Sequence, residues 1–390
     1  MHRITCAPFE VFRLIYLDNA ATSGLKPPCV IKAVESALKN MSVNPGRSSY
    51  SLAVSATETI FNIRRKISML INCDNENNVC FTQNCTHSIN AVLYGCLNKG
   101  DHVIISSLEH NAVWRPINYL FAERGIEFDI AEVNLFSDDV TVRNIKKLIK
   151  QNTKMIFVTA ASNVIGKRLP LASIGGLCKE KDIIFGVDGA QGVGIMPIDM
   201  QSMNIDYLCI APHKGLYAPM GTGVLVARKG IDKILISGGT GTNSIESVQP
   251  DDLPERIESG TLNVPGICGI GAGIDFINSK GIDKISDYEM NICKFAYRKL
   301  KEIGCVLYTE EPDKYSYCPV ISFNVKGKTS DEVGEILSKH NIAVRTGLHC
   351  APLAHNHLGT TNIGTVRISP SLFNRPQDIE RLIFIVKSAI

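Results

Sequence analysis

The stretch 185–226 constrains this chain most, because two apolar runs in this part of the sequence end at polar groups that can bind a single ligand. The run 182–187 has the composition of a buried parallel strand and is followed directly by Asp188. A second apolar run, 207–210, ends shortly before Lys214. Ligands of open α/β sheets bind at the carboxyl ends of the strands. The two strand ends are therefore predicted to present an acid and an amine to one cavity.

Asp188 and Lys214 each have a simpler interpretation when taken alone. An Asp-Gly pair after a strand is commonly a turn, and a single lysine is commonly a solvated surface charge. Together they favour a cofactor site, because a lysine after a buried strand can form a Schiff base and a carboxylate can keep a pyridine nitrogen protonated. Pyridoxal 5'-phosphate needs both groups, so the pair predicts this cofactor.

Two motifs in this stretch, VDGAQ at 187–191 and HKG at 213–215, resemble fold-type I pyridoxal-phosphate enzymes of the aminotransferase class V family. Within that family they are similar to the cysteine desulfurases with a short catalytic-cysteine loop. The likeness extends from the YLDNAAT segment that begins at Tyr16 to Arg367, which is nearly the whole chain. It implies conversion of L-cysteine to L-alanine, with transfer of the sulfur to an enzyme cysteine as a persulfide.

Length and composition agree with a globular protein of two or three domains. The chain has 390 residues, of which 45% are hydrophobic and 20% charged. Its formal charge is only +3 and no basic run is interleaved with aromatic residues, so nucleic acid is not an expected partner. No apolar run has the length of a signal peptide or of a membrane span, which predicts a cytoplasmic protein without membrane contact.

The 13 cysteines predict neither a disulfide framework nor a zinc ribbon, because their number is odd and no CxxC spacing occurs. Most of them are expected to be reduced, small core residues.

Apolar runs that alternate with helical patterns predict a mostly parallel sheet with right-handed crossovers. The runs are 103–106, 128–131 and 155–159. With the resemblance, the predicted fold is a fold-type I transferase: a large cofactor domain with a sheet of the seven-stranded type flanked by helices, and a smaller α+β domain that carries the catalytic cysteine. The expected boundaries are 16–265 for the large domain, and 1–15 with 266–390 for the small one.

Two helix starts are expected to contact the cofactor. A helix is predicted to begin at about Thr86, so that its free backbone donors and the threonine hydroxyl can bind the cofactor phosphate. The alternative is a threonine that only caps the helix. His110, in an EH pair, resembles the histidine that stacks on the pyridine ring in the family, and its alternative role is a helix cap on a loop.

The resemblance assigns four further residues to the cofactor. Asn163 and Gln191 orient the phenolic oxygen, and His213 belongs to the cofactor site beside the lysine. Thr261, in the segment SGTLNVPGI, corresponds to the threonine that reaches the phosphate of the neighbouring subunit. A homodimer is therefore implied.

Cys350 is the predicted nucleophile that receives the sulfur. It lies in an RTGxHC segment, whose Arg345 and His349 can stabilise a thiolate, and a proline follows closely. The alternative is that Cys350 is one more ordinary cysteine. Lys214 is expected to move the proton at Cα of the substrate.

Arg367 is the predicted partner of the substrate carboxylate, because a guanidinium matches a planar anion with two parallel hydrogen bonds. Its alternative role is a surface charge at a strand edge. The resemblance also places Asn19, Ala20 and Arg345 on the substrate side.

The sequence departs from the desulfurase pattern at three positions. Ala211 stands where a serine often precedes the His-Lys pair, Ala218 where a glycine is usual before the proline, and His87 where an acidic residue is frequent. One phosphate hydrogen bond is therefore missing or supplied elsewhere.

Two other interpretations remain open in the sequence. One is another class V enzyme, either a transaminase or a selenocysteine lyase, that shares the cofactor site without the persulfide step. The other is a non-catalytic partner in sulfur delivery. The sequence does not identify the sulfur acceptor, and a sulfur-acceptor protein is a further partner to consider.

Overall fold

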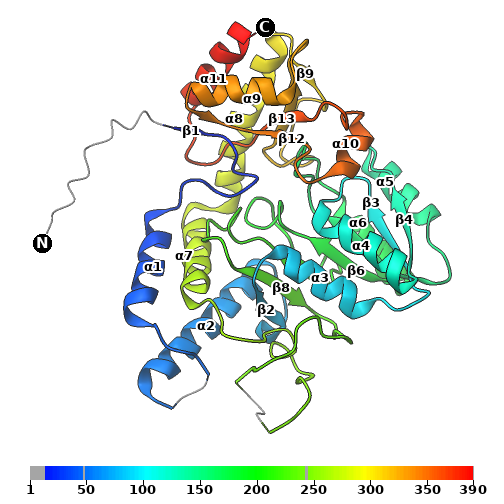
Figure 1. Ribbon diagram of the computed structural model, residues 1–390, viewed down its shortest axis with the longest axis vertical. Helices are drawn as coiled ribbons and strands as arrows, with labels where there is room; N and C mark the ends of the chain where they lie inside the picture. The colour runs from blue at the N-terminus through cyan, green and yellow to red at the C-terminus, as the bar shows by residue number, and fades with distance from the viewer. Residues whose placement is uncertain (1–13, 47–48, 242–244, 390) are drawn as a thin grey trace, which may run out of the picture.

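The computed structural model describes residues 14–389 except 47–48 and 242–244 (Figure 1). A seven-stranded sheet with strand order β2-β8-β7-β6-β5-β3-β4 forms its centre. The strands are β2 (Val79–Thr82), β3 (His102–Ser106), β4 (Glu127–Ala131), β5 (Thr153–Thr159), β6 (Ile184–Asp188), β7 (Tyr207–Ile210) and β8 (Gly223–Ala227). Pairs among β4, β3, β5, β6 and β7 are parallel, and β8 is antiparallel to both of its neighbours.

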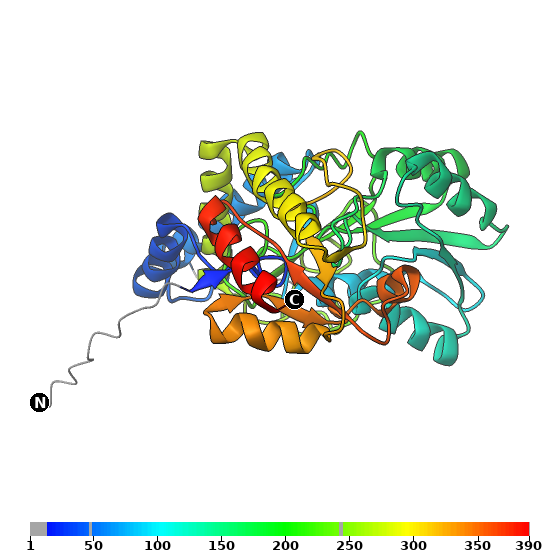
Figure 2. The same cartoon turned by 90° about the horizontal axis from the view of Figure 1, so that it is seen from above.

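Helices cover both faces of this sheet (Figure 2). On one face lie α3 (Cys85–Cys96) and α4 (Asn111–Arg124). The other face carries α2 (Ser51–Leu70), α5 (Asp138–Lys147), α6 (Leu171–Lys181) and α7 (Val264–Lys280), with α1 (Pro28–Asn40) packed on α7. Successive strand residues point to opposite faces, and both faces of the interior strands are buried, so these strands are mostly apolar. The edge strand β4 is partly exposed and carries Glu127 and Asp129.

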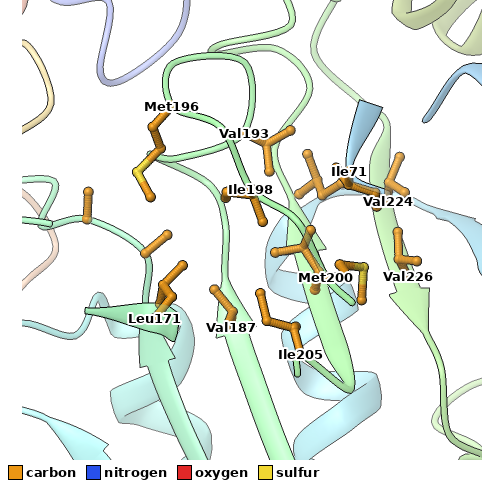
Figure 3. Close-up of a cluster of buried hydrophobic side chains, with 14 of the residues drawn as sticks. Ile71, Leu171, Val187, Val193, Met196, Ile198, Met200, Ile205, Val224 and Val226 are labelled. Atoms are coloured by element: carbon orange, nitrogen blue, oxygen red, sulfur yellow. The ribbon is translucent and has the colours of Figure 1, made fainter. Parts of the chain in front are cut away.

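The core between the sheet and the second group of helices is continuous beneath the predicted site. Val187 from β6, Val224 and Val226 from β8 and Ile71, the residue after α2, belong to one buried cluster (Figure 3). The turn after β6 adds Val193 to the same cluster (Figure 3). These contacts fix the position of the strand end that carries Asp188.

A second, smaller group of elements lies above the large sheet in Figure 1. Its antiparallel sheet has the order β12-β13-β10-β9. The elements are β9 (Val306–Leu307), β10 (Ile321–Asn324), β12 (Arg345–Gly347), β13 (Thr365–Ile368), α8 (Ile282–Glu302), α9 (Ser330–Lys339), α10 (Pro352–Leu358) and α11 (Pro376–Ala389). The short strand β1 (Ile15–Tyr16) pairs in parallel with β11 (Ile342–Ala343) of this group.

The predicted α/β class with a mostly parallel seven-stranded sheet is confirmed. The domain limits stay a proposal, and packing favours a modified boundary. Helix α7 belongs to the core of the large sheet, whereas Leu17 packs in the cluster of the small sheet. We therefore propose that the small domain begins after α7 and includes the segment around Leu17.

Gly175 lets helix α6 pack against the turn that precedes β7. A Cβ atom at this position would lie 1.8 Å from the carbonyl oxygen of Met203, which is far inside contact distance. The next residue, Gly176, has open space in the same direction. The two neighbouring glycines of one helix therefore have different roles.

We predict that Gly175→Ala destabilises the protein by about 1–3 kcal/mol, since an added methyl group forces the helix away from the turn. Gly176→Ala is the matched control, and it should stabilise the helix by up to about 1 kcal/mol. Urea unfolding of both variants measures the difference. Equal midpoints for the two variants would contradict the close packing of α6.

Candidate active site

One cavity of about 250 Å³ lies at the carboxyl ends of the parallel strands. Residues from both groups of elements line it, including every predicted site residue except Asn19 and Thr261. Those lining residues are Ala20, Thr86, His110, Asn163, Asp188, Gln191, His213, Lys214, Arg345, Cys350 and Arg367. The strand ends thus bring together side chains from the whole length of the sequence.

Asp188 and Lys214 reach the cavity from neighbouring strands. β6 and β7 pair in parallel, with Asp188 opposite Cys209. Asp188 is buried, and its Oδ1 accepts a hydrogen bond from the backbone N–H of Ala190 at 3.0 Å. Burial lowers the pKa of Lys214 below its usual value, and the charge of Asp188 opposes that shift. A lowered pKa favours the neutral amine, which is the form that reacts with a carbonyl group.

The amino end of α3 offers free hydrogen-bond donors to the cavity. Asn84 is its cap, because the Asn84 side chain accepts from the backbone N–H of His87 at 2.9 Å. The alternative in which Thr86 caps the helix is therefore wrong. No described residue accepts a hydrogen bond from the backbone N–H of Cys85 or Thr86 or from the Thr86 hydroxyl, so these donors are available to an anion.

His110 lines the cavity and is also the cap of α4, as one of its two interpretations predicted. Its Nδ1 accepts a hydrogen bond from the backbone N–H of Ala112 at 3.0 Å. Burial lowers the pKa of His110 to about 4, with Lys214 adding to the shift and Asp188 opposing it. The ring is therefore neutral at pH 7 and carries its proton on Nε2. While it caps the helix, the imidazole ring of His110 stays in the cavity wall, where a flat ligand can lie against it.

Two of the predicted cofactor residues, Asn163 and Gln191, have partly used their polar atoms within the protein. Asn163 donates from Nδ2 to the carbonyl oxygen of His349 at 2.7 Å, while its buried Oδ1 has no partner among the described residues. Gln191 donates from Nε2 to the carbonyl oxygen of Ala20 at 2.8 Å. Burial lowers the pKa of His213 to about 4, and its buried Nδ1 is also unpartnered within the described chain. Unpartnered buried polar atoms in a cavity wall favour a ligand.

Arg345 and Arg367 make one wall of the cavity positive. They are directly opposite each other on the antiparallel strands β12 and β13. Arg367 is 1% exposed and lies on an interior strand, so its interpretation as a surface charge at a strand edge is wrong. Its guanidinium pairs with Asp18 at 2.6 Å and donates to the carbonyl oxygen of Asn163 at 2.9 Å. Two facing cations with one carboxylate leave positive charge for a substrate anion.

The Cys350 thiol lies at the exposed side of the cavity, on a strained loop. His349 and Cys350 have φ values of 49° and 57°, in the left-handed region that non-glycine residues rarely adopt. Two bonds hold this backbone: Asn163 donates to the His349 carbonyl, and the backbone N–H of Asn111 donates to the Cys350 carbonyl at 2.7 Å. Arg345 contacts the thiol, with Nη2 3.4 Å from Sγ.

His349 does not stabilise the Cys350 thiolate, so that expectation is wrong. Its Nε2 lies 2.9 Å from Oγ1 of Thr365, inside the small group of elements. Burial lowers the pKa of His349 to about 2, and nearby Arg367 adds to the shift. The ring is neutral and supplies no positive charge to the sulfur. Arg345 is the cation beside the thiol.

Two predicted residues lie outside this cavity. Asn19 lines a smaller neighbouring cavity, where its Nδ2 donates to the carbonyl oxygen of Ser369 at 2.9 Å. Thr261 is exposed on the surface of its own chain. Its assignment to a cofactor in a second subunit stays a prediction.

Among the three departures from the desulfurase pattern, only Ala211 lines the cavity. Ala218 is buried, and Nδ1 of His87 accepts a hydrogen bond from the backbone N–H of Gln83.

Two residues of the site were not assigned a role from the sequence. Cys85 lies in the cavity with its Sγ 3.6 Å from Oδ1 of Asp188. Asp18 neutralises Arg367 from 349 residues away in the sequence. The only sequence signals were the place of Cys85 at a helix start and of Asp18 in the LDNAAT motif.

Within residues 14–46, 49–241 and 245–389, no helix is long and apolar enough to span a bilayer. The same residues contain no cluster of three or more histidine, cysteine, aspartate or glutamate side chains suited to a metal ion. Every cysteine of the described chain has a free thiol, and only Cys29 and Cys350 among them are exposed.

Comparisons with known proteins agree with this geometry. The Aminotransferase class-V family profile matches residues 15–382. A probable cysteine desulfurase from Methanothermobacter thermautotrophicus is 30% identical over 377 residues, which cover 94% of this chain and 92% of that protein. A cysteine desulfurase from Escherichia coli is 31% identical over 382 residues, covering 95% of this chain and 92% of that protein.

Solved structures show the same similarity. The apo cysteine desulfurase from Thermococcus onnurineus NA1 superposes with a TM-score of 0.87 at 28% identity, over 97% of this chain and 94% of that one. For the cysteine desulfurase CsdA from Escherichia coli the TM-score is 0.86 at 26% identity, over 96% of this chain and 94% of that one. The profile match spans nearly the whole chain, and this protein belongs to the aminotransferase class V family.

Proposed function

We propose that the protein is a pyridoxal-phosphate-dependent cysteine desulfurase. The observation that carries the proposal is that the Cys350 thiol shares one cavity with Lys214 and Asp188. A transaminase needs the lysine and the acid but has no use for a thiol at this place. The names of the relatives support the same reaction.

The residues present fit pyridoxal phosphate. Lys214 supplies an amine and Asp188 an anion beside it, as an aldehyde group and a pyridine nitrogen require. The free donors at the start of α3 suit the phosphate group. His110 is a neutral ring in the cavity wall, which suits packing against a flat heterocycle. When bound, the cofactor supplies an electron sink for the pair released at Cα of the substrate.

The remaining wall suits L-cysteine. Arg367 and Arg345 bind the substrate carboxylate, and Arg367 can exchange part of its bonding to Asp18 for this second anion. Lys214 moves the proton at Cα, and its lowered pKa favours the neutral amine that acts as the base. Ala20 and Asn19 contact the substrate side of the cavities.

Cys350 receives the sulfur. Its thiolate attacks the substrate sulfur, a new S–S bond forms, and the Cβ–S bond of L-cysteine breaks. The carbon that loses sulfur takes up a proton, and L-alanine leaves. Arg345, with its Nη2 3.4 Å from Sγ, places a positive charge beside the attacking sulfur. The product is a Cys350 persulfide, which passes its sulfur to an acceptor, for which a protein is a candidate.

We propose that the active form is a homodimer in the cytoplasm. Large apolar side chains are exposed on α1 and α2, among them Ile31, Leu38, Phe61 and Met69. A second chain would cover such a surface and bring Thr261 to its partner's phosphate site. The free thiols of the described cysteines agree with a reducing compartment.

Lys214→Ala should abolish covalent attachment of the cofactor and reduce turnover by about 10²–10⁴-fold or more, because the base at Cα is removed. Borohydride reduction of the protein loaded with pyridoxal phosphate, followed by mass spectrometry, measures the attachment. Lys229→Ala, at the opposite end of the sheet, is the control and should keep the covalent attachment of the cofactor. A wild-type chain that binds no pyridoxal phosphate would refute the proposed function.

Thr86→Val should weaken the binding of pyridoxal phosphate, since the variant loses a hydroxyl donor to a charged phosphate. Such a bond is worth about 1.5–3 kcal/mol, or roughly tenfold to hundredfold in the dissociation constant. Fluorescence titration of the apo protein with pyridoxal phosphate measures the dissociation constant. Thr57→Val, on an exposed helical position outside the cavity, should bind as wild type does. An unchanged constant for Thr86→Val would remove this residue from the phosphate site.

Cys350→Ser should bind pyridoxal phosphate as wild type does and release no alanine from L-cysteine, because a serine hydroxyl is not ionised at neutral pH. After brief exposure of wild type to L-cysteine, mass spectrometry should find one extra sulfur on the peptide that contains Cys350. Cys29→Ser, the other exposed cysteine of the described chain, should keep full turnover. The assignment fails if the sulfur is found on another cysteine.

A further inference from the structure

Cys85 is a second thiol of the cavity, and the proposed reaction gives it no role. It is the first residue of α3, and its Sγ lies 3.6 Å from Oδ1 of Asp188. Burial raises the pKa of Cys85 well above its usual value, and the charge of Asp188 adds to the shift. The sulfur therefore keeps its proton near neutral pH. The contact is an S–H group that donates to a carboxylate oxygen.

Both protein hydrogen bonds to the carboxyl group of Asp188 reach the same oxygen. Oδ1 accepts from Cys85 and from the backbone N–H of Ala190, whereas no described residue donates to Oδ2. The two donors fix the orientation of the carboxyl group about its last bond. Oδ2 is left as the oxygen that a ligand in the cavity can reach.

The place of Cys85 relative to Asp188 is fixed by backbone packing. Asn84 caps α3, and Gly223 at the start of β8 lies against the Asn84 backbone so closely that a Cβ atom on this glycine would be 2.3 Å from the Asn84 carbonyl carbon. The start of α3 is therefore held against the large sheet. A side chain at position 85 has little freedom to move away from the end of β6.

We propose that Cys85 is a positioning residue for Asp188: its thiol orients the carboxyl group toward the ring nitrogen of the cofactor and thereby shifts the protonation equilibrium of the bound ring. This inference rests on the proposed function. This role differs from that of a sulfur carrier, because the thiol donates its proton in a hydrogen bond to Asp188 and an attacking sulfur has to be a thiolate.

The first test uses the full-length protein loaded with pyridoxal phosphate. Cys85→Ala removes the donor, and the pH midpoint of the absorbance change of the bound cofactor should shift by about half a pH unit or more, which is roughly a threefold change in the equilibrium. Cys85→Ser supplies an O–H donor and should restore most of the wild-type midpoint. Cys29→Ala, at an exposed site, is the control and should leave the midpoint unchanged.

The outcomes separate a positioning role from a packing role. A midpoint that stays at the wild-type value in Cys85→Ala, with the cofactor bound, overturns the proposal. So does an equal shift in the alanine and serine variants, because a packing defect would not be rescued by the hydroxyl. Sulfur found on Cys85 after exposure to L-cysteine would also overturn it.

A second test needs no cofactor, so its failure is distinct from failure of the proposed function. In the apo protein, Asp188→Asn removes the negative charge beside Cys85, and the thiol should lose its proton at lower pH. Alkylation of Cys85 by iodoacetamide at pH 9 should then be about threefold faster or more than in wild type. An unchanged rate at Cys85 means that the S–H contact with Asp188 does not form.

Discussion

A backbone contact between two turns determines the geometry of the candidate site. The turn after β6 and the turn after β7 touch so closely that a Cβ atom on Gly215 would lie 2.2 Å from the carbonyl oxygen of Val193. Gly194 lies against the Gly215 carbonyl in the same way. Only glycine allows this approach, and it holds Lys214 beside the strand end that carries Asp188. The acid and the amine are therefore fixed by the main chain, not by flexible side chains.

The small group of elements supplies what the large sheet lacks. The large sheet provides an acid, an amine and free backbone donors, which suit a cofactor. Both arginines and the Cys350 thiol come from the small group, and these suit a charged substrate and its sulfur. Asn163 joins the two, because its side chain binds the His349 carbonyl and its own carbonyl accepts from Arg367. Asn163 is therefore, like Asn111, a link between the two groups of elements.

Sequence patterns predicted the strands and the ends that carry the site, because buried strands are continuous apolar runs and ligands bind at their carboxyl ends. They did not reveal the pairing of Asp18 with Arg367, since a contact between residues so far apart has no local signal. Asn84 and Thr86 are both good caps, and only the backbone shows which one is used. The direction of His349 depends on a hydrogen bond to Thr365 that no local pattern encodes.

The bonds to the backbone of Cys350 have a consequence for the fate of its sulfur. Asn111 and Asn163 hold two successive carbonyl groups of the loop, and both belong to the large group of elements. A swing of this loop into solvent would break both bonds at once. The two bonds therefore favour a loop that stays at the rim of the cavity. For the proposed Cys350 persulfide, this favours an acceptor that brings its own nucleophile to the rim of the cavity.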